Sequence, residues 1–240
     1  MTSSSKISAV IATYNEEEHI RECVESLLPV VEEIIVVDSF STDKTQEICL
    51  ELGVKFLQRP WEGFSSTKNW ANQQASYPFI LSIDADEVIS KELGTSLIKA
   101  KQELLDEHKV YKFNRLNNYC GMWMRYGGWY PDTKVRLFSN ANAIWEGDVH
   151  ERLIFDYPIS EQLLEGDLLH YSIKDKADHI ARVKKYCKLE KAFSNQFWAL
   201  LSAINTFIRI YILKKSFLAG RLGYQLAFIS ALAKFWRGKT

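Results

Sequence analysis

The sequence predicts an α/β fold with a doubly wound, mostly parallel sheet flanked by helices. Short apolar runs alternate with helical patterns through the first part of the chain, in the order that strand–helix–strand units produce. The runs are apolar throughout instead of alternating with polar residues, which is typical of strands buried on both faces. The 240 residues are enough for one large α/β domain, or for such a domain with an extension.

The first part of the chain supplies four strands and the helices between them. The strands are expected at residues 7–12, 34–37, 54–57 and 79–83. Asn15 is placed to cap a first helix, because its side-chain oxygen could accept hydrogen bonds from the first turn. Residues 41–43 are expected to cap a second helix that runs to about Leu52, and a third helix is expected at 65–75.

The later elements lead into a helical C-terminal part. Helices are expected at 90–105 and 174–198, and strands at 110–113, 135–138 and 168–171. From Phe197 to Trp236 apolar residues recur with helical period, and Gly220 and Gly223 interrupt the pattern. We therefore divide the chain into a first domain, residues 1–173, and a helical, basic, amphipathic extension, residues 174–240.

Two carboxylates, Asp84 and Asp86, follow the apolar run that ends at Ile83. Ligands of open α/β sheets bind beyond the carboxyl ends of the strands. If the strand stays extended, both side chains leave on the same face. Such hard oxygen ligands suit a Mg²⁺ or Mn²⁺ ion that also holds substrate phosphates. The alternative is an acidic loop that ends a strand and caps a helix.

Polar residues also follow the first and second strands. Thr13, Tyr14 and Asn15 end the first strand, and Asp38 ends the second. Each alone is as often a turn residue or a cap as a functional residue, but together they indicate a site at one edge of the sheet. The glycine pattern G-x-G-x-x-G that binds dinucleotides is missing after the first strand, and no P-loop motif is present.

Charge and cysteine usage restrict the cellular setting. The formal net charge is zero, but no acidic residue follows Glu190, whereas eight basic residues do, which favours an anionic partner such as a membrane surface. The four cysteines form no C-x-x-C pair, which argues against a zinc site and fits a reducing cytosol. No apolar run reaches the ~18 residues of a spanning helix, so none is expected.

Further candidate residues lie in the second half of the chain. The aromatic and glycine-rich segment 117–132 suits the C–H face of a sugar ring, although a packed loop has the same composition. His150 and Glu151 offer a metal or phosphate contact and a proton acceptor in adjacent positions. His170 is a second candidate ligand on an expected strand. Taken alone, such residues are more often structural.

Several of these segments together resemble glycosyltransferase family 2, which has the GT-A fold. The matching segments are residues 12–16, 37–43, 84–86 and 145–151. A closer likeness is to the bacterial lipopolysaccharide-core β-1,4-glucosyltransferases, and it rests on residues 61–64, 68–69, 128–132, 149–151 and the tail around 207–223. The pair His150–Glu151 departs from the two acidic residues that the family more often has.

The resemblance implies a role for each matching residue. Those that would bind the nucleotide-sugar are Thr13, Tyr14, Glu16 and Asp38 at the nucleoside, Lys68 near the diphosphate, and Asp84 at the ribose or sugar. Asp86 and His170 would bind Mg²⁺ or Mn²⁺. Glu151 would be the catalytic base, with Asp148 as second choice.

The resemblance also implies a reaction and a location. The enzyme would transfer a hexose, with inversion, from a nucleotide-sugar such as UDP-glucose to a lipopolysaccharide-core or other cell-envelope glycan. The acceptor would be lipid-linked, and the protein would lie in the cytoplasm, peripheral on the inner face of the cytoplasmic membrane. No nucleic-acid partner is expected, and the C-terminal helices could instead form a homodimer.

Two other functions compete with this interpretation. Residues 83–88 match the D-x-D-x-[TV] nucleophile motif of haloacid-dehalogenase-type phosphatases. That motif normally closes the first strand of its domain, whereas three strand–helix units precede it here. The second alternative is a catalytically inactive, membrane-peripheral scaffold, against which the presence of Asp86, Glu151 and His170 together argues.

Overall fold

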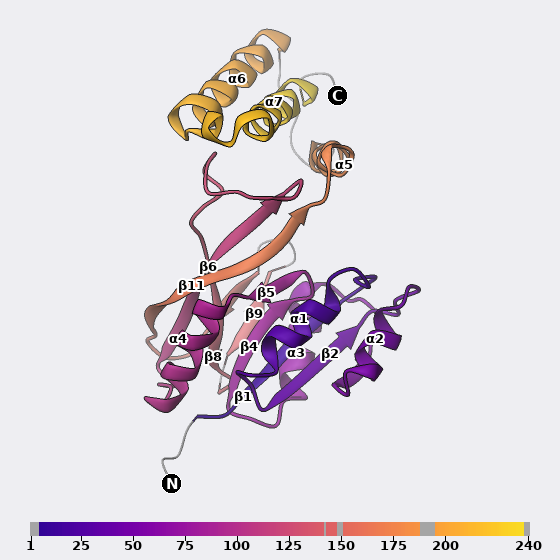
Figure 1. The fold of residues 1–240 in the computed structure, drawn as a ribbon, viewed down its shortest axis with the longest axis vertical. Coiled ribbons are helices and arrows are strands. Elements are labelled where there is room, and N and C mark those ends of the chain that lie inside the picture. The colour runs from indigo at the N-terminus through magenta and orange to yellow at the C-terminus, as the bar shows by residue number, and fades with distance from the viewer. Residues whose placement is uncertain (1–4, 142, 148–150, 188–194, 238–240) are drawn as a thin grey trace. The chain divides into compact units, whose positions relative to one another are not determined.

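The computed structural model describes residues 5–141, 143–147, 151–187 and 195–237. The chain forms two compact units (Figure 1). The first unit comprises residues 1–115 and 133–169, and the second comprises residues 116–132 and 170–240. The division of the sequence at residue 173 stays a prediction.

A mixed sheet forms the centre of the first unit. Its first four strands, in the order β3-β2-β1-β4, are parallel: β3 (Lys55–Gln58), β2 (Glu33–Asp38), β1 (Ile7–Thr13) and β4 (Phe79–Asp84). The order continues with β8 (Asp132–Ser139), β6 (Lys109–Tyr119), β11 (Ser160–Ile173) and β5 (Glu87–Ile89). Strand β8 is antiparallel to β4. The expected α/β class, its four parallel strands and the GT-A-like arrangement are confirmed.

Helices cover both faces of the parallel strands, which explains why the strand sequences do not alternate. The helices α1 (Ile20–Leu27), α2 (Thr45–Glu51) and α4 (Lys91–Gln102) contribute buried residues to one core, together with Ile7, Ala9 and Ile11 of β1. Helix α3 (Phe64–Gln73) packs on the opposite face, where Ala71 and Trp145 share a second core with Val10. Trp145 belongs to β9 (Ile144–Glu146), which pairs with β10 (Arg152–Ile154).

Asn15 does not cap the first helix, which is a correction to the sequence prediction. Helix α1 begins only at Ile20, and Asn15 has a positive φ of 54°. Its Oδ1 accepts a hydrogen bond from the Thr42 N–H at 2.8 Å, and its own N–H donates to Ser41 Oγ at 2.8 Å. Asn15 therefore joins the loop after β1 to the loop after β2. At the start of α2, Asp43 Oδ1 accepts from the Thr45 N–H at 3.0 Å.

Strand β4 ends at Asp84, and residues 85–86 form a turn before β5. The sequence analysis expected Asp84 and Asp86 on the same face only if the strand stayed extended through Asp86. The turn means that this condition is not met. The physical reason is Glu87, whose fully buried carboxylate accepts a hydrogen bond from the Asp84 N–H at 3.1 Å. The turn places the Glu87 side chain inside the protein, close to the backbone of Asp84.

The second unit is built largely from helices. They are α5 (Lys176–Cys187), α6 (Gln196–Ile208), a π-helical turn (Arg209–Leu213), a 3₁₀ turn (Ser216–Ala219) and α7 (Gly220–Trp236); the short strand β7 (Met122–Trp123) pairs with β6. A single helix over 174–198 is not formed. Asn195 has extended backbone, and its Oδ1 accepts from the Phe197 N–H at 2.8 Å, so a new helix begins at Gln196.

Helix α7 packs closely at Gly223. A Cβ atom on Gly223 would lie 1.7 Å from the carbonyl oxygen of Ser216, so only glycine fits. The Ser216 hydroxyl donates to the Gly223 carbonyl at 3.1 Å. Leu226 of α7 then packs with Ile210 and Ala219 in the core of this unit. The glycine that interrupts the apolar pattern thus permits close packing of α7 against the preceding 3₁₀ turn.

The segment Gln196–Leu213 is long and apolar enough to cross a membrane, with a mean hydropathy of 1.3 and 17% of it buried. The expectation of no spanning helix therefore stays a prediction. It required an unbroken apolar run, whereas polar residues such as Asn205 and Arg209 lie within this segment. Length and composition alone do not establish that the helix spans a bilayer.

Candidate active site

The ends of β1 and β2 bring Thr13 and Asp38 side by side in the register of the sheet. Asp38 is fully buried, and its carboxylate accepts hydrogen bonds from the Ser41 hydroxyl, from the Ser41 N–H at 2.9 Å and from Gln58 Nε2 at 3.1 Å. Tyr14, next in the chain, is exposed. The two loops thus form a rigid polar edge with an aromatic side chain beside it.

Glu16 lies in the same loop region. Its N–H donates to Thr45 Oγ1 at 2.8 Å, and Thr45 is buried at the start of α2. This backbone contact fixes the course of the chain from β1 toward α1. The four residues expected at the nucleoside, including Glu16, consequently come from one region of the first unit.

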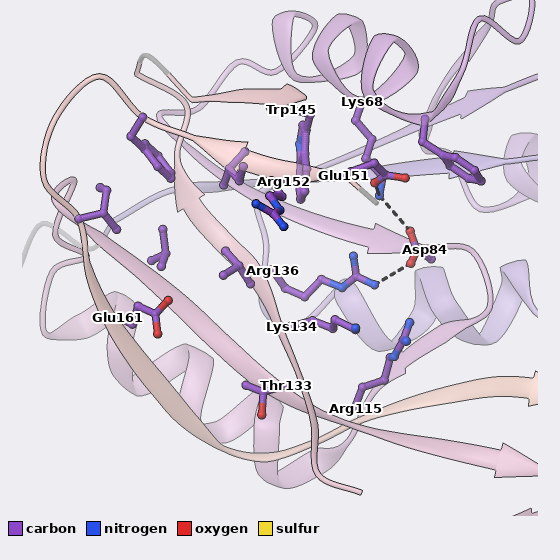
Figure 2. A pocket seen from close by; sticks show the side chains of 16 residues that line it. Lys68, Asp84, Arg115, Thr133, Lys134, Arg136, Trp145, Glu151, Arg152 and Glu161 are labelled. Atoms are coloured by element: carbon purple, nitrogen blue, oxygen red, sulfur yellow. Dashed lines mark hydrogen bonds and ion pairs between the residues drawn. The ribbon is translucent and has the colours of Figure 1, made fainter. Parts of the chain in front are cut away.

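Asp84 lies between two cations at the end of β4 (Figure 2). Its Oδ2 accepts from Arg136 Nη2 at 2.6 Å, and its Oδ1 lies 3.6 Å from Lys68 Nζ. Burial would raise the pKa of the Asp84 carboxyl, but the charges of Arg136 and then Lys68 hold that pKa well below its usual range. The carboxylate is therefore ionised and held from two sides.

Arg136 is buried and binds a second carboxylate as well. The same Nη2 atom donates to Glu87 Oε1, and Arg115 Nη1 lies 3.3 Å from that oxygen. Burial would lower the pKa of Arg136, but the neighbouring charges of Asp84 and Glu87 raise it above its ordinary value. The result is a buried ionic cluster that joins β8 and β6 to the turn after β4.

Lys68 of α3 links Asp84 to Glu151. Its Nζ lies 2.7 Å from Glu151 Oε2 and 4.9 Å from the centre of the Trp145 ring. Lys68 is only 7% exposed, so water and salt weaken this ion pair much less than they would weaken one on the surface. Next to it, Asn69 Oδ1 accepts from the Trp145 N–H at 2.8 Å, and Asn69 Nδ2 donates to the Trp145 carbonyl at 2.9 Å. These bonds fasten β9 to α3.

The structure thus brings together Lys68, Asp84 and Glu151, three of the residues that the sequence singles out. The alternative base, Asp148, and the neighbouring His150 lie outside the described residues. Asp86 is half-buried on the turn after β4. His170 belongs to the second unit, where its Nδ1 lies 2.5 Å from Asn117 Oδ1.

The described residues contain no group of three or more His, Cys, Asp or Glu side chains arranged to hold a metal ion. The roles of Asp86 and His170 as metal ligands stay predictions.

A pocket of about 810 Å³, here called the β8 pocket, opens beside Asp84 and Glu151 (Figure 2). Its polar lining residues are Lys68, Asp84, Arg115, Thr133, Lys134, Arg136, Glu151, Arg152 and Glu161, and its apolar ones are Phe64, Val110, Val135, Trp145, Leu153, Phe155 and Ile159. The sequence interpretation missed its arginines and Lys134, as well as Glu87. Arg136 carries one available signal, a charge inside the otherwise apolar run 135–138.

Comparisons with known proteins agree with this architecture. Residues 8–121 match the sequence model described as Glycosyl transferase family 2. An uncharacterized glycosyltransferase of Rickettsia typhi is 31% identical over 97% of this chain and 85% of its own length. The lipopolysaccharide core biosynthesis glycosyltransferase LpsC of Rhizobium meliloti is 29% identical over 95% of this chain and 89% of its own.

Solved structures show more distant likenesses. S. aureus TarS, residues 1–349, was solved in complex with UDP; it is 18% identical with a TM-score of 0.49, over 96% of this chain and 80% of that one. Glucosyl-3-phosphoglycerate synthase from Mycobacterium tuberculosis was solved with Mn²⁺ and UDP-glucose. It is 23% identical with a TM-score of 0.39, over 48% of this chain and 44% of that one.

Replacing Arg136 by Met should destabilise the protein strongly, because Glu87 and Asp84 would lose a buried cation. Breaking a buried ion pair from one side costs about 3–5 kcal/mol in the free energy of unfolding. The measurement is urea unfolding followed by circular dichroism. The control is Lys134→Met on the same strand, where a half-exposed charge is removed and the expected change is within about 1 kcal/mol. Equal losses from both variants would contradict the structural role of Arg136.

Proposed function

The chain belongs to glycosyltransferase family 2, and we propose that it is an inverting, metal-dependent enzyme acting on a lipopolysaccharide-core or other cell-envelope glycan. The donor would be a UDP-sugar carrying a hexose, with UDP-glucose as the first candidate. The observation that carries the proposal is the convergence of Asp84 and Glu151 on Lys68 at the carboxyl end of β4. The similarity to LpsC supports the class of acceptor.

The nucleoside of the donor fits the polar edge at the ends of β1 and β2. Asp38 and Thr13 offer hydrogen-bonding groups there, and exposed Tyr14 offers an aromatic face. The diphosphate would then extend toward β4, because ligands of open α/β sheets follow the carboxyl edge of the strands. Lys68, whose Nζ lies 3.6 Å from Asp84 Oδ1, is a cation that could meet the diphosphate there.

Glu151 is the proposed general base. An inverting transfer needs a carboxylate that removes the proton from the acceptor hydroxyl as the new glycosidic bond forms and the bond to the diphosphate breaks. Lys68 holds Glu151 in place before substrates bind. Donor phosphates would compete for Lys68, and this would leave the Glu151 oxygen available to the acceptor hydroxyl. Asp148 remains the second candidate.

A metal ion fits this site only if the donor supplies most of its ligands. Mg²⁺ and Mn²⁺ sites of this type use one or two carboxylates together with phosphate oxygens and water. Asp86, half-buried on the turn after β4, could supply one carboxylate. When bound, the metal would neutralise the charge that develops on the leaving diphosphate.

The phosphatase alternative finds no support in this geometry. In that mechanism the first aspartate of the motif is the nucleophile. Here that residue is Asp84, whose two carboxylate oxygens face Arg136 and Lys68. Membership of glycosyltransferase family 2 accounts for the same motif without a nucleophilic role.

Glu151→Gln should lower turnover by at least about 10²-fold while donor affinity changes little, because glutamine keeps the shape but cannot accept the proton. The measurement is release of UDP from UDP-glucose in the presence of a cell-envelope glycan acceptor, alongside calorimetric titration with UDP. The control is Glu103→Gln, an exposed carboxylate that pairs with Lys99 of α4 outside the pocket. Turnover unchanged in Glu151→Gln but lost in Asp148→Asn would move the role to Asp148.

Asp86→Asn should weaken the dependence of UDP binding on the metal, because one hard anionic ligand is lost. We expect the affinity for UDP with Mn²⁺ to fall toward the affinity without metal. Calorimetric titrations with and without Mn²⁺ measure the difference, and Asp106→Asn in a loop away from the site is the control. An unchanged response of Asp86→Asn to Mn²⁺ would exclude Asp86 as a ligand.

We also propose that the second unit docks on an anionic membrane surface, on the cytoplasmic face. Its exposed apolar side chains include Phe197, Trp198, Leu200, Leu201, Ile204, Ile208, Ile212, Leu213, Phe217 and Leu218. Every charged residue from Gln196 to Arg237 is basic. Helices with exposed apolar and aromatic side chains and only positive charges suit the interface of an anionic bilayer.

The full-length protein should float with anionic vesicles but not with neutral ones, and high salt should release it. Replacing Lys214, Lys215 and Arg221 together by Gln should weaken binding by about 1 kcal/mol per charge. The matched control replaces Lys91, Lys99 and Lys109 of the first unit by Gln. Protein that ignores anionic vesicles at low salt and sediments as a dimer would contradict docking, and retention after an alkaline carbonate wash would indicate a spanning helix.

A further inference from the structure

The β8 pocket lies on the side of β4 away from the proposed nucleoside site. In the sheet order β3-β2-β1-β4-β8-β6, Thr13 and Asp38 end strands that precede β4, whereas most of the pocket is lined from β8, β6 and β10, with Lys68 of α3, Asp84 of β4 and Trp145 of β9 on its remaining side. No residue before Phe64 lines it. Lys68, Asp84 and Glu151 also line the pocket, so a molecule bound in it would reach the proposed base.

The lining of the pocket is predominantly cationic. Its described residues include five cations, Lys68, Arg115, Lys134, Arg136 and Arg152, against three carboxylates, Asp84, Glu151 and Glu161. Each of these carboxylates already has a cation within the first unit, since Glu161 pairs with Lys112 at 2.8 Å and the other two pair with Lys68 or Arg136. Among the cations, Lys68 and Arg136 pair with these carboxylates and Arg115 pairs with the buried Glu87, while the lining as a whole holds more cations than carboxylates.

Three of the cations come from three different strands: Arg115 from β6, Lys134 from β8 and Arg152 from β10. Lys134 lies two residues before Arg136 on β8, so both share one face of that strand. Arg115 extends from β6 toward the same region, and Arg152 enters from β10 between Trp145 and Arg136 (Figure 2). Guanidinium groups bind phosphate and carboxylate through paired N–H donors, which a neutral hydroxyl cannot match.

Apolar side chains complete the pocket. Trp145 and Phe155 line it together with Phe64 and Leu153. Aromatic and aliphatic surfaces of this kind can pack against the C–H face of a sugar ring, while the cations bind charged substituents. The lining therefore combines the two chemistries that an anionic sugar presents.

We propose that the β8 pocket is the acceptor subsite and that it selects a glycan bearing a phosphate or carboxylate group, bound by Arg115, Lys134 and Arg152. This rests on the proposed transferase function and adds the chemical class of the acceptor to it. The anion would sit on the β8–β6 side, and the hydroxyl to be glycosylated would face Glu151. The cations would thus select the acceptor and orient it.

The test uses the full-length protein loaded with UDP and Mg²⁺, so that the donor site is filled. Calorimetric titrations compare glucose 6-phosphate, glucuronate and glucose. At least one anionic sugar should bind about 10-fold or more tightly than glucose, with an affinity that falls at high salt. Tighter binding of glucose 6-phosphate assigns a phosphate, and tighter binding of glucuronate assigns a carboxylate.

Variants locate the binding in the pocket. Arg152→Gln and Lys134→Gln should each reduce affinity for the anionic sugar about 5- to 10-fold, and Arg152→Lys should restore part of the loss. Lys99→Gln, which removes an exposed charge on α4, is the matched control. Thermal unfolding of each variant shows whether the fold is intact.

Two results would overturn the acceptor subsite. One is equal binding of charged and neutral sugars to the UDP-loaded protein, and the other is anion binding that UDP abolishes, since the cations would then belong to the donor site. A protein that does not bind UDP with metal would instead contradict the proposed function, so the two failures are distinguishable.

Discussion

The buried guanidinium of Arg136 is the contact on which the geometry of the site depends. It joins β8 to Asp84 at the end of β4 and to Glu87 at the start of β5. Arg136 and Glu87 are buried, whereas Asp84 is partly exposed, and burying the Arg136–Glu87 pair costs several kcal/mol per ion unless the geometry is well matched. The turn between Asp84 and Glu87 is therefore held in one conformation, which presents Asp86 at the edge of the sheet.

Lys68 extends this ionic cluster across the site. By contacting both Asp84 and Glu151, it connects the end of the parallel sheet to the segment that precedes β10. The same cation that orients the proposed base would meet the donor phosphates. In the proposed mechanism, binding of the donor would therefore expose the base through this one side chain.

The sheet and the strand-end residues could be predicted because they follow from local patterns. Apolar runs such as Phe79–Ile83 specify strands buried on both faces, and the carboxyl ends of those strands must meet. The pairing of Lys68 with Glu151 spans 83 residues and has no local signature. The sequence places Arg136 on a strand, but its pairing with the buried Glu87 is visible only in the structure. Asn15 was misassigned because helix caps and loop bridges use the same side-chain oxygen.

The most direct test of the central claim is hydrogen–deuterium exchange of the full-length protein with and without UDP and Mn²⁺. The account places the nucleotide at the ends of β1 and β2, on the far side of Asp84 from the β8 pocket. It predicts that UDP protects the backbone amides of residues 13–16 and 38–42 and leaves those of residues 133–137 largely unchanged. Protection confined to residues 133–137, or none at all, would contradict it.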